Sequence, residues 1–327
     1  MRTSTRRRAV RLVVIGAFIA MQASSVLFGQ QQNLSRSAQI APEVVAQWRA
    51  SGAQEIEWNN GVPYIDRVPG FTVPKGDVIP GPYTAAATKQ LPQPSVPFGI
   101  DTSLDEPTKA DIAELTRFKQ LQWLRFSRFL WPGAGIQELR ALPQLKAIVM
   151  DRVNGVDRTV TDADAKGIAA IKQLQSLVLQ DANITDAGLA ELAQLKNLEF
   201  LDISGTKVTD EGLKHFQALG NVQVIDLSGT KIRGTGIKHL VPLRGLRRLN
   251  LTYSAITDEG LKEVARLTQV RDLVLANNKL TDAGVKNLSA MKRLESLELT
   301  GNPYVSRQAV DDLQKQLPAT KIRWSPN

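Results

Sequence analysis

Apolar positions repeat with a period of 24 residues along the last two thirds of the chain. Leu201 and Ile203 alternate with the spacing of a strand, and Leu213, Phe216 and Leu219 follow with the spacing of a helix. Each unit therefore predicts one short strand and one helix. The aligned units begin at Leu121, Leu145, Leu174, Leu198, Val222, Leu246, Val270 and Leu294.

The units are expected to stack on one another. One strand and one helix of this length cannot bury their apolar faces alone, whereas stacked copies bury both. Five extra residues between Leu145 and Leu174 form an insertion near residues 153–159, and residues 108–118 predict a helix ahead of the first complete unit. Trp324 is expected to cover the core at the C-terminal end.

Three polar positions recur in the units, and each has an expected structural role. Short polar side chains after the strand are expected to bond inward-facing loop backbone; they are Thr206, Thr230, Ser254, Asn278 and Asn302. Aspartates just ahead of the helix are expected to cap its free N–H groups; they are Asp186, Asp210, Asp258 and Asp282. Glycines two residues later predict close approach of neighbouring units, and they are Gly188, Gly212, Gly236, Gly260 and Gly284. Gly234 replaces the aspartate once, so that helix is expected to begin less tightly.

The unit Leu-x-x-Leu-x-Leu-x-x-(Thr/Asn/Ser)-x-Ile-Thr-Asp-x-Gly-Leu resembles the leucine-rich repeat family. Its Thr-Asp-x-Gly-Leu part is similar to the variant found in many bacterial exported proteins and in F-box-type substrate receptors of ubiquitin ligases. The resemblance implies an α/β fold, a right-handed solenoid or horseshoe of about eight repeats. Its parallel sheet would line the concave side and its helices the convex side.

Residues 1–30 have the composition of an export signal. Five arginines precede an uncharged apolar stretch from Leu12 to Gly29, and small residues at 23–25 suit a cleavage site. An uncleaved membrane anchor is the alternative, because this stretch is just long enough to span a bilayer. Both interpretations place the rest of the chain outside the cytoplasm, as a periplasmic, cell-surface or secreted protein.

The formal charge of +9 is largely a property of those first thirty residues. The chain has 41 Lys and Arg against 32 Asp and Glu, and residues 1–30 hold five of the basic residues and none of the acidic ones, so the remainder carries +4. With no basic stripe expected on the sheet, nucleic acid is not an expected partner. The chain has no cysteine, which excludes disulfides, thiolate metal sites and a thiol nucleophile.

Residues 31–107 hold ten of the sixteen prolines and are expected to be extended, without a long helix or a central strand. Two parts of this segment are predicted to be ordered. Residues 41–51 predict a short helix, and Asn59-Asn60-Gly61 between alternating apolar positions predicts a hairpin over residues 56–65. We expect this segment to be an N-terminal cap on a repeat domain of residues 108–327.

Side chains that alternate with the core leucines of each strand are expected on the open, concave face of the sheet. Aromatic and arginine side chains among polar groups are typical of a protein-binding patch. The candidate ligand-binding residues are Trp123, Arg125, Phe200, Asp202, Val224, Asp226, Arg248, Asn250, Tyr253 and Asp272. The predicted function is an exported, monomeric, non-catalytic module that binds an unidentified protein partner and needs no cofactor.

Two other classes of function stay open. A cytoplasmic substrate adaptor of a ubiquitin ligase would fit the repeat variant, but the proline-rich residues 31–107 are unlike the compact helices of an F-box. An enzyme would use Asp202 and Asp226, which are expected on neighbouring strands. Neither a histidine nor a cysteine is expected beside them, which argues against catalysis.

A metal site is also not expected. His215 and His239 occupy the same position in adjacent units, with Glu191 and Glu263 on either side. Neighbouring helices of a solenoid lie about 10 Å apart, which is far for two imidazoles to share one ion.

Overall fold

The structure is a computed structural model that describes residues 43–44, 47, 78–81, 91–95, 97–102, 108–127, 135–151 and 160–325. The predicted export signal, the hairpin at residues 56–65 and the insertion near residues 153–159 lie outside these residues. Of the helix predicted over residues 41–51, Glu43, Val44 and Gln47 are described, and all three are helical. Residues from Ala38 onward form one compact unit.

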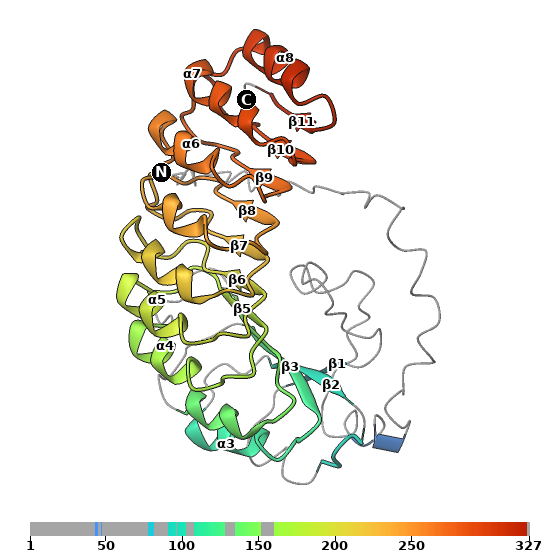
Figure 1. The fold of residues 1–327 in the computed structure, drawn as a ribbon. Coiled ribbons are helices and arrows are strands. Elements are labelled where there is room, and N and C mark those ends of the chain that lie inside the picture. The colour runs from blue at the N-terminus through green and yellow to red at the C-terminus, as the bar shows by residue number, and fades with distance from the viewer. Residues whose placement is uncertain are drawn as a thin grey trace, which may run out of the picture. The chain divides into compact units, whose positions relative to one another are not determined.

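Strands of the described residues form one parallel sheet of eleven, in which spatial order follows chain order (Figure 1). They are β1 Val78–Gly81, β2 Phe98–Thr102, β3 Leu121–Ser127, β4 Ala147–Asp151, β5 Ser176–Leu179, β6 Phe200–Asp202, β7 Val224–Asp226, β8 Arg248–Asn250, β9 Asp272–Val274, β10 Ser296–Glu298 and β11 Lys321–Arg323. The predicted architecture of repeated strands in one parallel sheet is confirmed.

The register follows the 24-residue period of the sequence. Phe200 in β6 pairs with Val224 in β7, and Val224 pairs with Arg248 in β8. Between β4 and β5, Ala147 pairs with Ser176, 29 residues later. The five-residue insertion therefore lengthens the connection between the two strands without changing which residues share a face of the sheet.

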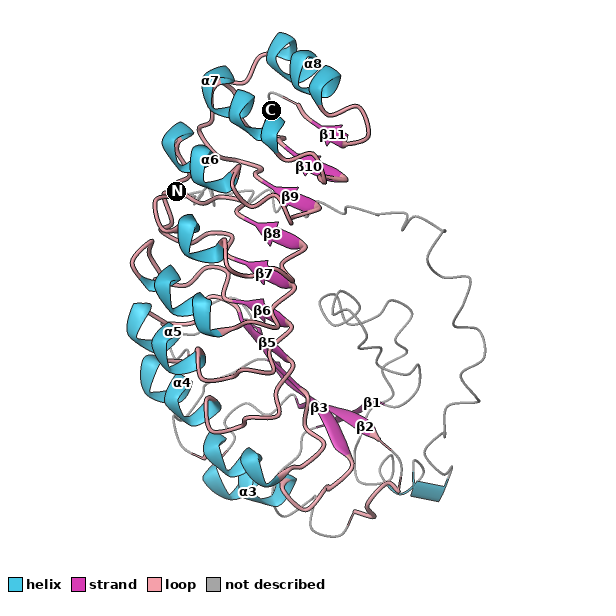
Figure 2. Cartoon of the chain, in the orientation of Figure 1, coloured by secondary structure: helices cyan, strands magenta, loops and turns pink. Residues whose placement is uncertain are grey.

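Short helices lie on the other side of each unit, opposite the strands (Figure 2). The α-helices are α3 Lys109–Leu115, α4 Asp162–Ile168, α5 Asp186–Leu192, α6 Asp258–Val264, α7 Asp282–Val285 and α8 Arg307–Gln316. The 3₁₀ helices are η2 Ile136–Ala141, η3 Gly212–Ala218, η4 Ile237–Leu240 and η5 Lys286–Ala290. None of the helices in the described ranges is long and apolar enough to span a membrane.

A continuous apolar core fills the space between the sheet and the helices. Leu201, Ile225 and Leu249 contribute to it from consecutive strands, and Leu213 and Phe216 contribute from η3; all five are fully buried. Trp324 packs against the same core after the last strand, as predicted. Burial of this kind, repeated from unit to unit, is the main stabilising contribution in a stacked array.

The expectation that residues 31–107 contain no central strand is wrong. β2 lies between β1 and β3 inside the sheet. Proline does not prevent this, because β2 itself contains none, and Pro80 falls in β1, an edge strand, where proline is tolerated. Phe98 in β2 packs edge-to-face on Phe118, just ahead of the first complete unit, with ring centroids 6.0 Å apart. The proline-rich segment therefore extends the sheet at its N-terminal end.

The short polar residues after the strands bond loop backbone, as predicted. Thr206 and Thr230 are buried, and their hydroxyls donate to the carbonyls of Ile203 at 2.7 Å and Leu227 at 2.6 Å. Asn302 is fully buried, and its amide donates to the carbonyls of both its own unit and the preceding one. These side chains satisfy carbonyls that would otherwise be buried without a partner.

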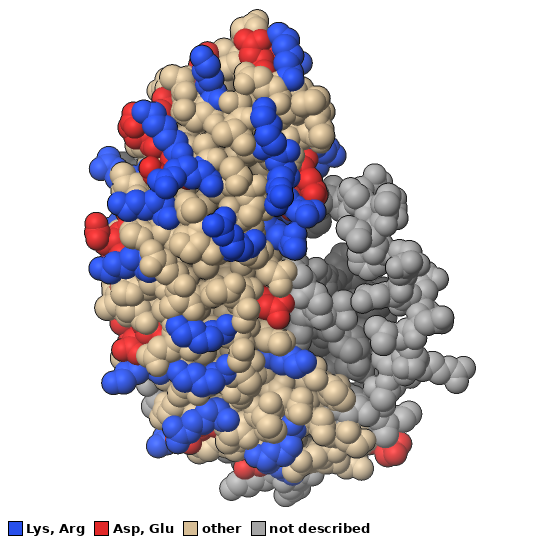
Figure 3. All heavy atoms as spheres, viewed as in Figure 1, with Lys and Arg blue, Asp and Glu red and all other residues tan. Residues whose placement is uncertain are grey.

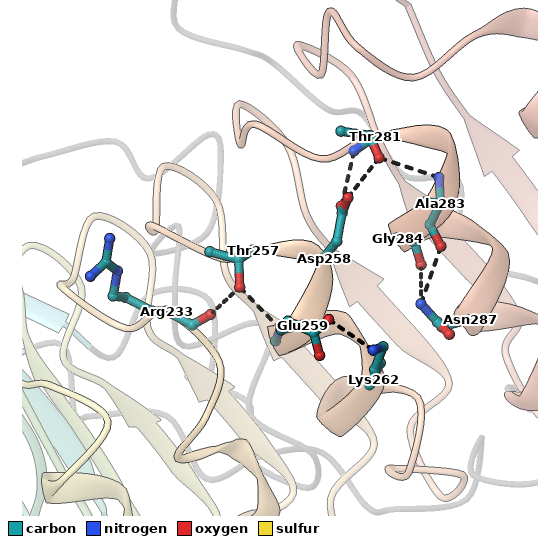
Figure 4. Close-up of polar contacts among 10 residues, drawn as sticks. Arg233, Thr257, Asp258, Glu259, Lys262, Thr281, Ala283, Gly284 and Asn287 are labelled. Carbon is teal, nitrogen blue, oxygen red and sulfur yellow. Dashed lines mark hydrogen bonds and ion pairs between the residues drawn. The ribbon is translucent and has the colours of Figure 1, made fainter.

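The predicted role of the repeated aspartates is wrong in one respect: their carboxylates bond the following unit. A threonine provides the N-cap of α5, α6 and α7, and the aspartate is the first helical residue. Asp258 accepts from the backbone N–H of Thr281 at 3.0 Å and from its hydroxyl at 2.6 Å (Figure 4). The same pair of bonds joins Asp162 to Thr185, Asp186 to Thr209 and Asp282 to Ser306.

We call this series of carboxylate bonds the aspartate ladder, and it is interrupted once. Asp210 accepts from the backbone N–H groups of Arg233, Gly234 and Gly236. Gly234 has no carboxylate to extend to the next unit, so Thr257 donates to the neutral carbonyl of Arg233 instead (Figure 4). The helix after Gly234 is η4, four residues long and without a side-chain cap, which fits the looser start predicted for it.

The repeated glycines allow the close approach that the sequence predicted. A Cβ on Gly284 would collide with the carboxylate of Asp258, and one on Gly236 would collide with the backbone of Asp210. The aspartate ladder and the glycines are therefore two parts of one contact between successive units.

This contact predicts a measurable coupling between Asp258 and Gly284. Asp258→Ala is expected to lower the free energy of unfolding by about 2 kcal/mol, because two hydrogen bonds to a charged group are lost. Gly284→Ala is expected to cost about 1–3 kcal/mol in the native protein and clearly less in the Asp258→Ala variant. Urea denaturation of the two single variants and the double variant measures the interaction.

Gly220→Ala is the matched control, because a Cβ there meets nothing within 4 Å. It is expected to change stability by less than about 0.5 kcal/mol. Additive effects of Asp258→Ala and Gly284→Ala would show that the contact between the two residues does not hold the units together.

Candidate functional site

The register brings the predicted face residues together in two columns that cross the sheet. One column runs through Trp123, Ala147, Ser176, Phe200, Val224, Arg248, Asp272 and Ser296. The second runs through Arg125, Val149, Val178, Asp202, Asp226, Asn250, Val274 and Glu298. We call the surface formed by these two columns the open face, because it lies opposite the core.

The candidate residues differ sharply in exposure. Trp123, Phe200, Asp202 and Val224 are buried, with 1%, 2%, 0% and 8% of their surface exposed. Arg125, Asp226, Arg248, Asn250 and Asp272 are half-buried. Tyr253 is 69% exposed. Apart from Arg125, the open face is therefore closed to a large partner from β3 to β6, and accessible side chains begin at β7.

Polar residues of the second column bond the turn that follows their own strand. Asp202 accepts from the backbone N–H of Ser204 at 2.9 Å, and Asp226 accepts from that of Ser228 at 2.9 Å. Asn250 accepts from Thr252 in the same way and donates its amide to Asp226 at 2.8 Å. A carboxylate or amide at this position thus stabilises the end of the strand.

Asp202 is an unusual member of this series. Burial, and to a smaller extent the neighbouring Asp226 carboxylate, raise the pKa of its carboxyl to about 7, against hydrogen bonds from Ser204 and Gln180 that lower it. Gln180 donates to its second oxygen at 3.1 Å. A carboxyl group that ionises near neutral pH could act in acid–base chemistry, but Asp202 is fully buried, so no substrate reaches it in this structure.

Charged residues of both signs lie on and beside β8, β9 and β10. Burial raises the pKa of Asp272 above its ordinary value, and the positive charge of Arg248 on the adjacent strand offsets part of this rise. At the border of the face, Arg271 forms an ion pair with Glu295 at 2.8 Å. Figure 3 shows Lys and Arg side chains interspersed with fewer Asp and Glu over the visible surface of the repeats.

Tyr253 lies in the turn after β8 with an unusual backbone conformation. Its φ is 51°, in the left-handed region that favours glycine, asparagine and aspartate. The equivalent turns of other units hold such residues at this position: Asp181, Gly205, Gly229, Asn277 and Gly301, all with positive φ. Tyr253 was selected from the sequence for its aromatic ring, and its strain was missed, although an alignment of the turns would have revealed it.

The histidines make limited contacts. His239 Nδ1 lies 2.9 Å from the side-chain nitrogen of Gln217, and both histidines are half-buried. In the ranges that the structure describes, His, Asp and Glu side chains form no group of three or more that could hold a metal ion.

Comparison with known proteins identifies the repeat. The family model described as "Leucine Rich repeat" matches residues 173–193, 194–216, 245–265 and 267–289. The chain therefore contains leucine-rich repeats. A search of curated proteins finds no significant match.

Solved structures that align with the chain include internalins from Listeria monocytogenes. One internalin aligns with a TM-score of 0.50 and 17% identity, covering 68% of this chain and 59% of its own. This leucine-rich repeat protein thus spans less than two thirds of that relative. An internalin C2 from the same organism aligns with a TM-score of 0.44 and 21% identity, covering 59% of this chain and 84% of its own.

The buried carboxyl predicts a specific pH dependence for the stability of this leucine-rich repeat protein. Because the folded pKa of Asp202 is about 7 and its ordinary value is 3.8, the folded state holds a proton that the unfolded state has lost in this range. The free energy of unfolding therefore falls as the pH rises between these values. Each unit of difference in pKa corresponds to about 1.4 kcal/mol.

Asp202→Asn removes this titration. The variant is expected to be more stable than the native protein at about pH 8, with the difference disappearing toward about pH 4, as measured by urea denaturation across the range. Glu259→Gln, on the exposed surface of α6, controls for the removal of one negative charge. A constant difference between Asp202→Asn and the native protein at all pH values would contradict the assignment.

Proposed function

We propose that this protein is an exported, non-catalytic leucine-rich repeat module that binds a protein partner through the accessible part of its open face. The observation that carries the proposal is Tyr253, an exposed aromatic residue retained in a strained backbone conformation next to that face. Asp226, Arg248, Asn250 and Asp272 lie on the strands beside it.

Strain at Tyr253 supports a functional role. A non-glycine residue in the left-handed region costs on the order of 1 kcal/mol or more, and such outliers are frequent at binding sites. The five equivalent turn positions avoid most of this cost with glycine, asparagine or aspartate. Since Tyr253 is 69% exposed, its ring does not offset the cost by packing in the core.

The surroundings of Tyr253 fit a protein-binding patch. Tyrosine and arginine are enriched among the residues that dominate binding energy, and charged residues of both signs around them favour specific partners. Arg247, directly before Arg248, is exposed at the border of the open face. A partner with acidic groups at its rim would complement this border.

Several observations support a binding role without catalysis. Asp202 is buried, and Asp226 is engaged by Ser228 and Asn250, so both carboxylates have structural roles in the turns. The chain has two histidines and no cysteine. A rigid, preformed surface also loses little conformational entropy on binding, which suits recognition.

Export is supported by the first thirty residues and by composition. Five arginines followed by an uncharged apolar stretch are typical of a signal peptide. The internalin of similar fold with the TM-score of 0.50 is a bacterial protein, and a bacterial source is compatible with such a signal. We propose a periplasmic, cell-surface or secreted location, with cleavage near residues 23–25 or retention of the segment as an anchor.

Tyr253→Gly is the test of the binding proposal. The variant is expected to keep its stability or gain up to about 1 kcal/mol, because glycine adopts this φ without strain. Its affinity for the partner is expected to fall at least about tenfold, because the exposed ring is lost. The measurements are urea denaturation and quantitative capture from extracts and medium of the source cells, with immobilised native protein defining the partner.

Two control variants accompany this experiment. Asn277→Gly changes the equivalent turn one unit later, and Tyr304→Ala removes the ring of another exposed tyrosine, which is 63% exposed. Both are expected to capture the partner as the native protein does. Retention of the partner by Tyr253→Gly would overturn the role of this residue.

Export is tested separately by fractionating the source cells and measuring the intact mass of the mature protein. A signal peptide predicts a mass that lacks about the first 25 residues. An anchor predicts the full mass in the membrane fraction. Full-length protein in the cytoplasm would contradict export and revive the adaptor hypothesis.

A further inference from the structure

The turns that lead from each helix into the next strand lie together along one edge of the sheet. All strands are parallel, so their N-terminal ends meet at this edge and their C-terminal ends at the opposite one. Backbone bonds join successive turns: the N–H of Arg271 donates to the carbonyl of Arg247, and that of Arg247 to the carbonyl of Gln223, both at 2.8 Å. We call the turns into β3 to β11 the entry edge, and they comprise residues 119–122, 143–146, 172–175, 196–199, 220–223, 244–247, 268–271, 292–295 and 318–321.

The entry edge is strongly basic. It holds ten Lys and Arg residues and two Glu residues, a net charge of +8, whereas residues 31–327 as a whole carry +4. Nine of the ten basic residues are exposed and one is half-buried; they are Lys119, Lys146 (half-buried), Lys172, Lys196, Arg244, Arg247, Arg271, Lys292, Arg293 and Lys321. On the visible face of the molecule, Lys and Arg side chains gather along the length of the repeats (Figure 3). The rest of residues 31–327 is acidic on balance, with a net charge of −4.

The opposite edge has a different charge. We call the loops after β5 to β10 the exit edge, and they comprise residues 180–186, 203–210, 227–234, 251–258, 275–282 and 299–306. These loops hold four basic and five acidic residues, a net charge of −1. Both edges are turns of the same repeat and both need polar residues, so solubility alone does not explain why one sign of charge gathers on one edge.

The positive charges of the entry edge have little internal compensation. Within the described ranges, Arg271 is the one basic residue of this edge that pairs with a carboxylate, that of Glu295 at 2.8 Å. Lys172 and Lys292 bond neutral oxygens instead, of the Gln194 side chain at 3.1 Å and the Gln316 carbonyl at 3.2 Å. Like charges on neighbouring turns repel one another and destabilise the folded chain. An anionic partner would remove this cost.

We propose that the entry edge binds the surface of a membrane that contains anionic phospholipids, through charge attraction and without insertion. The presence of the protein at such a membrane rests on the export proposed above, whereas the binding itself does not. Tyr253 lies in a loop of the exit edge. A molecule that lies on its entry edge therefore presents Tyr253 on the side away from the membrane, where a protein partner reaches it.

The composition of the entry edge fits a lipid surface better than other polyanions. Its turns contain no Phe, Tyr or Trp. Single-stranded nucleic acid is held by stacking on aromatic side chains, and protein interfaces are dominated by buried aromatic and arginine anchors. A membrane surface needs no pocket and no stacking, because each Lys or Arg near it adds to the attraction.

The extent of the entry edge also fits a surface. Strands lie about 4.8 Å apart, so the turns into β3 to β11 span roughly 40 Å. Attraction to an anionic membrane acts over about 8–10 Å at physiological salt. Side chains spread along the whole edge therefore contribute together, whereas a small anion would meet only one or two of them.

Vesicle binding by the full-length protein tests the entry edge. The partition coefficient is measured by co-sedimentation with vesicles of phosphatidylcholine, alone or with about one third phosphatidylserine, at low and at high salt. Arg244→Gln, Arg293→Gln and Lys321→Gln are combined in one variant, because none of these side chains bonds another residue in the described ranges. Each basic residue near an anionic surface accounts for about fivefold in affinity, so this variant is expected to bind anionic vesicles on the order of a hundredfold more weakly at low salt.

The matched control removes the same charge from the exit edge, by combining Lys207→Gln, Lys231→Gln and Lys279→Gln. It is expected to bind within about threefold of the native protein, because these charges lie on the far edge. Residues 1–30 are unchanged in every variant, so their contribution cancels in the comparison. Equal loss of binding in both variants, or loss in neither, would overturn the proposal. Binding to duplex DNA without binding to anionic vesicles would overturn it as well.

A second measurement locates the two edges relative to the membrane, and it also applies if residues 12–29 anchor the chain to every vesicle. The native chain has no cysteine, so Thr268→Cys on the entry edge and Ala255→Cys on the exit edge each accept one fluorophore; both positions are exposed. Anionic vesicles with spin-labelled lipid headgroups are expected to quench the fluorophore at position 268 and not the one at position 255. Equal quenching at both positions, or none at position 268, would contradict the proposed orientation.

Tyr253→Gly separates this inference from the proposed binding of a protein partner. The variant is expected to bind anionic vesicles as the native protein does, while it loses the partner. If the native protein binds vesicles but captures no partner, only the proposed function fails. If it captures a partner but does not bind anionic vesicles, only the membrane inference fails.

Discussion

The structure depends on one contact that recurs between successive units: a carboxylate at the start of one helix bonds the threonine or serine that caps the next. Because Asp258 reaches Thr281 in this way, the two helices approach so closely that only glycine fits at Gly284. This contact sets the spacing of the helices on one side of the units. The strands on the other side follow the same 24-residue period. Leucines fill the space between them, and their burial supplies most of the stability.

The opposite side of the sheet is not uniform, although the backbone repeats closely from unit to unit. From β3 to β6 its side chains are mostly apolar and buried, and from β7 onward they are mostly polar and more accessible. The change in side chains and the change in burial coincide at Val224 and Asp226. The recognition site that we propose therefore lies in the C-terminal units, which hold Tyr253 and Arg248.

Much of the fold follows from the spacing of residues along the chain. The two columns of the open face, the bonds of Thr206 and Asn302, and the close approach at Gly284 were all predicted from the repeat. The direction of the aspartate bonds was not predicted, because a period of 24 residues does not show whether a carboxylate bonds its own unit or the next one. The burial of Trp123, Phe200 and Asp202 was also missed, because the period assigns each residue to a face of the sheet but does not give its exposure. β2 was missed because its prolines flank the strand and leave its ladder intact.

The aspartate ladder is interrupted at Gly234, so the interface between units is expected to be less stable there than elsewhere in the array. In a one-dimensional stack each interface contributes its own share to folding, and here a neutral carbonyl replaces a carboxylate between the units of β7 and β8. Two glycine backbones, at Gly234 and Gly260, meet at this seam. Cooperativity is therefore expected to be weakest between the units of β7 and β8, so the array is expected to unfold in two parts that meet there, with Tyr253 in the C-terminal part.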